Sequence, residues 1–179
     1  MGSAGLVVVG VADMAIGSAA KDRQIITYAL GSCIGLTAYD PVSKVGGMVH
    51  FMLPQPSPQQ DPAELKPYMY ATTGVALLFR RLADSGAQKA RLVVCAAGAA
   101  QIMSDNGTFA VGKRNHTMLR KILWKDGTVL AGEDTGGNLA RTLSLDLGDG
   151  SVRVKTREGT KALWVPLMPS TPQQIGRTK

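Results

Sequence analysis

Apolar residues in the first third of the chain fall into short runs rich in β-branched and aromatic residues, separated by glycine, proline or charged residues. Short runs of this composition are typical of β-strands. We therefore expect strands at residues 6–11, 24–30, 34–39 and 48–53, with an irregular segment over 12–23. A turn that Asp40–Pro41 begins and Gly46–Gly47 closes predicts a hairpin between the last two strands.

The middle of the chain changes to helical periodicity. Five prolines between residues 54 and 67 exclude a central strand or a long helix, so we expect a surface loop there. After it, Tyr68, Val75 and Leu82 belong to an apolar set with helical spacing, which predicts a helix over 68–84. We then expect a strand at 91–96 and a second helix over 111–124, which stops at an Asp-Gly pair.

Strand patterns return in the last third. We expect strands at residues 128–131, 141–147, 151–156 and 163–167. The second of these alternates polar and apolar residues, and Asp149–Gly150 is a strong hairpin turn before the third. The elements predict one α/β domain over 5–168, in which helices pack on a mixed, mostly antiparallel sheet. A flexible tail over 169–179 is expected to follow.

Composition narrows the function classes. The chain has 179 residues, of which 45% are apolar and 18% charged, and a formal net charge of +7; these values suit a soluble globular protein. No apolar run approaches the roughly 18–20 residues that span a bilayer, so we expect no membrane insertion. The basic residues are scattered, and three Phe, two Trp and four Tyr offer no evident stacking platform, so nucleic acid is not an expected partner.

The numbers of cysteines and histidines narrow the possible function classes further. The two cysteines, Cys33 and Cys95, are too few for a disulfide framework. Free thiols favour a reducing compartment, so we expect a cytoplasmic protein. The sequence contains no CxxC, no HxxxH and no histidine-rich tract, so no metal site is predicted.

Cys33 is the first candidate for chemistry. A free cysteine is most often a small buried hydrophobe, and that interpretation fits Cys95, which lies within a predicted strand. Cys33 instead follows Gly31 and Ser32, a loop that can expose the sulfur and aim backbone N–H groups at a developing oxyanion. We therefore interpret Cys33 as a nucleophile, which needs a base to activate it.

Two histidines are available as that base. His50 lies on the second strand of the predicted hairpin, and pairing with the first strand brings it toward Cys33; the alternative is a core histidine without a chemical role. His116 lies in the basic second helix, where no predicted pairing brings it to Cys33. Thr27 lies on the strand that enters the cysteine loop and is available to orient the base, although threonine is also an ordinary strand residue.

Several motifs together resemble the CheD family, the chemoreceptor glutamine deamidases of bacterial and archaeal chemotaxis. The resemblance covers roughly residues 5–165 and comprises LGSC at 30–33, YDP at 39–41, GGMVHFMLP at 46–54, GKRN at 112–115 and EDTGGN at 133–138. GSC and HFMLP together are far more specific than either motif alone. The resemblance implies a layered α/β sandwich similar to the catalytic domain of deamidating bacterial toxins.

The resemblance also implies an activity, that of a protein-glutamine glutaminase acting on methyl-accepting chemotaxis receptors. The family nucleophile falls on Cys33, its base on His50 and its third residue on Thr27. Backbone N–H groups of Ser32 and Cys33 are expected to hold the oxyanion, and no cofactor is expected. The candidates for the rim of the substrate site are Gly31, Pro54, Gly136, Gly137 and Asn138.

Alternatives stay open at this point. One is a non-catalytic chemotaxis adaptor that binds a receptor or a CheC-type phosphatase, a partner of family members in species that have one. Another is a cysteine amidohydrolase for a small amide. The sequence also departs from the family pattern at residues 97–100, where Ala-Gly-Ala-Ala replaces a glycine-rich turn. This departure bears on the shape of one loop and leaves the three catalytic positions untouched.

Overall fold

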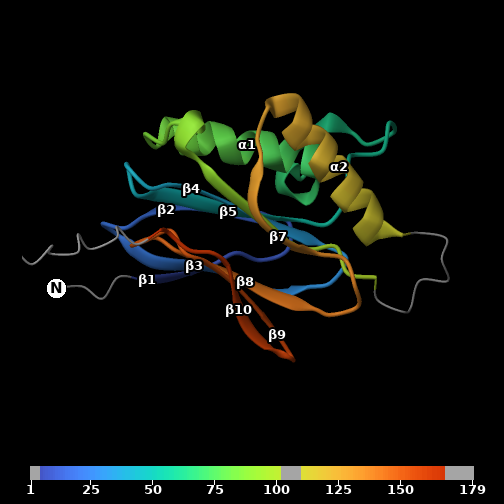
Figure 1. Ribbon diagram of the computed structural model, residues 1–179. Coiled ribbons are helices and arrows are strands. Elements are labelled where there is room, and N and C mark those ends of the chain that lie inside the picture. Colours follow the sequence, from blue (N-terminus) through green and yellow to red (C-terminus); the bar gives the residue numbers. More distant parts are fainter. Residues whose placement is uncertain (1–4, 102–109, 168–179) are drawn as a thin grey trace, which may run out of the picture.

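A computed structural model describes residues 5–101 and 110–167, whose strands form two five-stranded sheets (Figure 1). In spatial order, the first sheet consists of β2 (Asp13–Ser18), β5 (Val45–Phe51), β4 (Ile34–Asp40), β6 (Val93–Gly98) and β7 (Leu130–Thr135). The second consists of β1 (Gly5–Val8), β3 (Asp22–Leu30), β8 (Arg141–Asp146), β9 (Val152–Thr156) and β10 (Gly159–Trp164). The β1–β3 and β6–β7 pairs are parallel and the others are antiparallel.

Two α-helices cover the outer face of the first sheet (Figure 1). α1 (Ala71–Asp84) buries a stripe that includes Val75 and Leu78, and α2 (Val111–Asp126) buries Leu119 and Leu123. Burying one such side chain contributes about 1.5–3 kcal/mol, so this layer is a main source of stability. Short 3₁₀ turns at Pro62–Glu64, Pro67–Met69 and Lys89–Arg91 connect the elements. In the described part of the chain, neither helix has the length and apolarity needed to cross a membrane.

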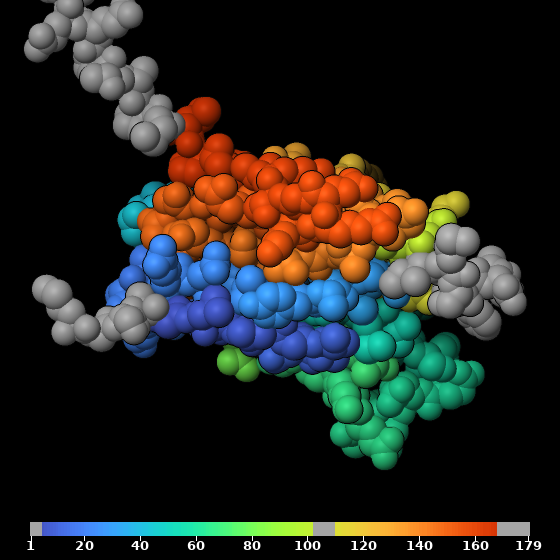
Figure 2. Space-filling model, turned by 90° about the horizontal axis from the view of Figure 1, so that it is seen from below, coloured from blue at the N-terminus to red at the C-terminus, as the bar shows by residue number. Residues whose placement is uncertain are grey.

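The second sheet packs on the opposite face, so the molecule is a layered α/β/β sandwich and the predicted fold class is confirmed. Every residue of β4 and β5 is buried, because these central strands have the helices on one side and the second sheet on the other. Tyr39 and Met48 point into the layer between the sheets and pack in one cluster with Leu143 and Leu145. Within residues 5–101 and 110–167, no α-helix lies over the outer face of the second sheet (Figure 2).

The predicted hairpin is confirmed, with Ile34 opposite Phe51 in the β4–β5 pair. β3, the strand predicted at 24–30, belongs to the second sheet, so it does not pair with the hairpin strands and faces them across the core. A bulge in β3 places both Thr27 and Leu30 inside, because Ala29 adopts a positive φ of 56° and shifts the alternation by one residue.

Several predicted boundaries also need correction. Residues 12–23 are not irregular, because β2 lies there and pairs along β5; this pairing outweighs the poor strand propensity of its Asp, Ala and Gly. β1 ends at Val8. β7 continues to Thr135 because it pairs with β6 that far. The last strand starts at Gly159, where it forms a hairpin with β9. The expected tail over 169–179 lies outside the described residues.

Candidate active site

Cys33 lies in the loop between β3 and β4, and the chain that leaves β6 holds this loop. The Ala99 N–H donates to the Cys33 carbonyl and the Ala100 N–H to the Gly31 carbonyl, each at 2.8 Å. Gly98, with a φ of +121°, approaches so closely that a Cβ atom would lie 2.1 Å from the Cys33 carbonyl oxygen. Position 98 therefore requires glycine, and the 97–100 turn that departs from the family pattern shapes the cysteine loop.

Asn115 of α2 supports the same loop from the other side and is fully buried. Its Nδ2 group donates to the carbonyls of Ser32, at 3.0 Å, and Met52, at 2.9 Å. Both partners are carbonyl oxygens, which only accept hydrogen bonds, so the side-chain atom that faces them is the amide nitrogen and not the amide oxygen. Asn115 thus ties the cysteine loop to the chain that leaves β5. Asn115 belongs to the GKRN motif, which does not by itself assign it a role. Its spacing of four residues from Leu119 does place it on the buried side of the helix.

His50 is buried between the two sheets, where its imidazole contacts Thr27 of the opposite sheet. Nδ1 lies 2.8 Å from the Thr27 hydroxyl oxygen, and that hydroxyl donates to the Val9 carbonyl at 2.7 Å. A hydroxyl has only one hydrogen to donate, so Thr27 accepts from the Nδ1–H group. The lone pair of His50 is therefore on Nε2. The expected contact between Thr27 and the imidazole is present.

The register of the hairpin brings Cys33 and His50 to one end of the same layer. His50 is opposite Gly35, two residues after Cys33. Gly35 faces the layer between the sheets, since a Cβ there would meet Thr27 and Leu30 side chains. Cys33 is half-buried and packs against the apolar cluster of this layer. The cysteine, the histidine and the threonine thus belong to one region of the molecule.

Burial sets the protonation states of the two groups. It lowers the pKa of His50 to about 4, because a charged imidazolium is disfavoured away from water. It also raises the pKa of the Cys33 thiol, against a smaller opposing effect of the Cys33 backbone N–H. Both groups are therefore neutral at pH 7. His50 Nε2 is buried and has no hydrogen-bond partner among the described residues, so it is free to accept a proton.

The predicted rim residues lie around this loop. The Gly136 N–H donates to the Gly98 carbonyl at 2.9 Å, and the Gln101 N–H donates to the Gly137 carbonyl at 2.7 Å. The glycine turn therefore adjoins the end of β6 that holds the cysteine loop. Gly137 and its neighbour Asn138 are exposed, so this turn offers surface to a large substrate.

The other two rim candidates have a different environment. Gly31 and Pro54 are buried, so each contributes little exposed surface and mainly shapes the loop or the chain after β5. Pro54 lies two residues after Met52, whose carbonyl Asn115 binds. The rim function of all these residues stays a prediction.

Cys95 and His116, the other cysteine and the other histidine, have different surroundings. Cys95 is fully buried in the layer between the sheets, as expected for a core residue, and burial raises the pKa of its thiol to about 12. His116 contacts Glu133 of β7 at 2.5 Å. Among residues 5–101 and 110–167, no group of three or more His, Cys, Asp or Glu side chains is placed to hold a metal ion.

The fold and the site define a layered α/β/β sandwich with a cysteine loop beside a buried, oriented histidine. Comparison with known proteins shows that the chain belongs to the CheD family: a family model described as CheD chemotactic sensory transduction matches residues 52–156. A probable chemoreceptor glutamine deamidase CheD of Solibacter usitatus is 44% identical over 95% of this chain and 98% of its own length. Similar proteins of Syntrophus aciditrophicus and Pyrococcus abyssi are 43% and 40% identical, over 87% and 82% of this chain and 96% and 89% of their own lengths.

Proposed function

We propose that this protein hydrolyses specific glutamine side chains of methyl-accepting chemotaxis receptors to glutamate. Its relatives are named as probable chemoreceptor glutamine deamidases. The observation that carries the proposal is the state of His50, which is neutral, held at Nδ1 by Thr27 and without a partner at Nε2. Burying an unsatisfied polar atom costs about 1–3 kcal/mol, so a purely structural histidine would not be expected to retain one.

The first half of the reaction forms a thioester. His50 Nε2 removes the proton from the Cys33 thiol as the sulfur attacks the side-chain carbonyl carbon of glutamine. Because both groups start neutral, the thiolate forms during the attack and not before it. In the described part of the chain, no backbone carbonyl accepts from the N–H groups of Ser32 and Cys33, so these donors are available to the oxyanion. The imidazolium then protonates the departing nitrogen, and ammonia leaves.

The second half of the reaction regenerates the cysteine. His50 removes a proton from water, the resulting hydroxide attacks the thioester carbon, and the intermediate collapses with expulsion of the Cys33 thiolate. The imidazolium returns its proton to this sulfur. The net change is the addition of one water, which converts the amide into a carboxylic acid and ammonia. Thr27 accepts from the Nδ1–H group of His50, so Nε2 remains the nitrogen that accepts and returns protons in both halves of the reaction.

The setting of the reaction is part of the proposal. Receptor glutamines are the substrate, and a CheC-type phosphatase is a partner in a species that has one. The two free cysteines support a cytoplasmic location, since free thiols persist in a reducing compartment. A non-catalytic adaptor, the alternative, would not require a buried His50 Nε2 atom without a hydrogen-bond partner.

The test is deamidation of a receptor cytoplasmic fragment by the purified protein. We expect ammonia release together with a mass increase of about 1 Da per modified site, because an acid replaces an amide through the thioester route. Cys33→Ala is expected to release none while it melts like the wild type and still binds the fragment. Ammonia release at the wild-type rate by folded Cys33→Ala would contradict the proposal. Binding of the fragment without any mass change would favour the adaptor.

A further inference from the structure

α2 presents a basic groove beside the cysteine loop. The groove has a volume of about 400 Å³. Its lining includes three cations, Lys113, Arg114 and Lys121, and the apolar Met118 and Pro54. No acidic residue lines it. We call this surface the α2 groove.

The cations of the α2 groove have no acidic partner within the described residues. Lys113, Arg114 and Lys121 take part in none of the ion pairs there. In contrast, Arg120 of the same helix contacts Glu133 at 3.5 Å. Three like charges around one apolar patch make a concentrated positive potential that favours an anionic ligand.

The α2 groove is joined to the candidate active site through its lining. Asn115, the residue after Arg114, binds the carbonyls of Ser32 and Met52, and Pro54 follows Met52 by two residues. Lys113 also lines a second hollow of about 210 Å³ that includes the Gly136–Gly137 turn. A polypeptide bound in the α2 groove would therefore pass beside the loop that carries the nucleophile.

We propose that the α2 groove binds an acidic segment of the substrate polypeptide and so selects glutamines that have carboxylates nearby. This inference rests on the proposed function and names what distinguishes one glutamine from another. Lys113 and Lys121 are eight residues apart on α2, or about 12 Å at 1.5 Å per residue. The best substrate is therefore a segment with two carboxylates at that separation, which on a helical substrate corresponds to seven or eight residues. Met118 receives the aliphatic part of such a segment.

The test compares two synthetic helical peptides that each contain one glutamine. In the acidic peptide two glutamates flank the glutamine at a separation of eight residues; in the basic peptide two lysines replace them. Ammonia release is measured with wild type, Lys121→Glu and Lys125→Glu. Lys125 is exposed on the same helix and does not line the α2 groove, so its reversal is a control with the same change of net charge.

We expect wild type to prefer the acidic peptide. Lys121→Glu should raise KM for the acidic peptide about 10-fold with little change in kcat, because the lost contact binds ground state and transition state equally. The same variant should improve the KM for the basic peptide, whereas Lys125→Glu should behave like wild type with both. At about 1 M salt, where the Debye length is about 3 Å, the preference should disappear.

Two outcomes would overturn the proposal: equal KM values for Lys121→Glu and Lys125→Glu with the acidic peptide, or a loss by Lys121→Glu that is the same for both peptides. Failure of the proposed function gives a different result, namely no ammonia from either peptide with wild type. In that case fluorescence anisotropy of the labelled peptides with the same variants tests the α2 groove alone. A wild-type preference for the acidic peptide that Lys121→Glu reverses supports it, and equal binding of the two peptides contradicts it.

Discussion

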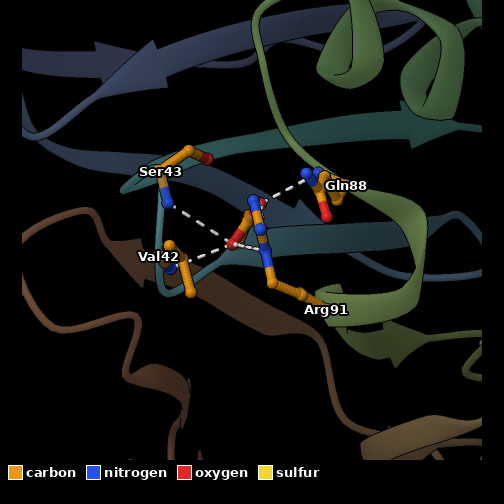
Figure 3. Close-up of polar contacts among 5 residues, drawn as sticks. Val42, Ser43, Gln88 and Arg91 are labelled. Atoms are coloured by element: carbon orange, nitrogen blue, oxygen red, sulfur yellow. Dashed lines mark hydrogen bonds and ion pairs between the residues drawn. The ribbon is translucent and has the colours of Figure 1, made fainter.

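The two ends of β4 both bury polar groups, but they differ in how far those groups find hydrogen-bond partners. At the Asp40 end, the buried carboxylate accepts from the Arg91 guanidinium and from the backbone N–H groups of Val42, Ser43 and Gln88 (Figure 3). The guanidinium, at 2.6 Å, is the main reason that the pKa of Asp40 lies well below its usual range. This network joins the hairpin turn to the chain before β6.

At the Cys33 end, polar atoms are buried without partners. His50 Nε2 and Asn115 Oδ1 have none among the described residues. Of the groups around Asp40, only the hydroxyl of the half-buried Ser43 shares this condition, and the carboxylate itself has several donors. Unsatisfied buried groups reduce stability, and they recur where a site must meet a substrate. We infer that the Asp40 end is organised for stability and the Cys33 end for chemistry.

The largest expected effect separates activity from stability at the Cys33 end. Cys33→Ala should lower turnover by about 10⁴-fold or more, because alanine offers no group that can form the thioester. Its melting temperature should stay close to that of wild type, since Cys33 is half-buried in a loop. Cys95→Ala is the matched control: it should retain turnover and lose about 1 kcal/mol of stability from a small cavity. An inactive but folded Cys95→Ala would contradict the assignment.

The second-largest expected effect is a loss of stability at the Asp40 end, with turnover retained. Asp40→Asn should lower the free energy of unfolding by about 3 kcal/mol, because it leaves Arg91 without its anion and turns an amide toward backbone donors. The melting temperature should fall by roughly 6–12 °C, while turnover at low temperature stays within about twofold of wild type. Asp84→Asn, an exposed aspartate on α1, is the control for the charge change. A large loss of turnover in folded Asp40→Asn would show that the two ends are not separate.

The pH dependence of stability should distinguish the two ends as well. His50 has a pKa of about 4 when folded and about 6.5 when unfolded, so the unfolded chain binds more protons between these values. Stability should therefore fall by about 2 kcal/mol from pH 7 to pH 5. The pKa of Asp40 is lowered by folding, so its contribution is complete above about pH 4 and is lost only below it. Urea unfolding at pH 7 and pH 5 should show a smaller decrease for His50→Gln, and an equal decrease in both proteins would contradict the burial effect.

The hairpin and the two helices could be predicted from the sequence because their patterns are local. Residues 34–39 and 48–53 are apolar runs joined by a turn, and the helices repeat apolar residues at a fixed spacing. The sheet to which β3 belongs could not be predicted in this way, because a strand with one buried face pairs equally well in either layer. The bulge at Ala29, which turns both Thr27 and Leu30 inward, likewise has no sequence signal of its own.

The candidate site likewise has features that local sequence patterns predict and features that they do not. Cys33, His50 and Thr27 could all be named as candidates from the sequence, but the contact of Thr27 with the imidazole depends on how the two sheets pack. The contacts of Asn115 are backbone carbonyls of two segments remote in sequence, and carbonyls leave no trace in side-chain patterns. Long-range contacts between layers therefore make up the part that local reasoning does not reach.

The smallest expected effect concerns the Thr27 hydroxyl, which orients His50 without taking part in bond formation. Thr27→Val keeps the shape of the side chain but leaves the Nδ1–H and the Val9 carbonyl unpaired, so the imidazole is no longer held in the tautomer that exposes Nε2. We expect kcat to fall about 10-fold with KM unchanged, since only the proton transfers are impaired. Thr27→Ser retains the hydroxyl and should recover most of the loss. If Thr27→Val keeps the wild-type kcat while Thr27→Ser is slow, the methyl group packed toward Gly35, and not the hydrogen bond, determines the position of His50.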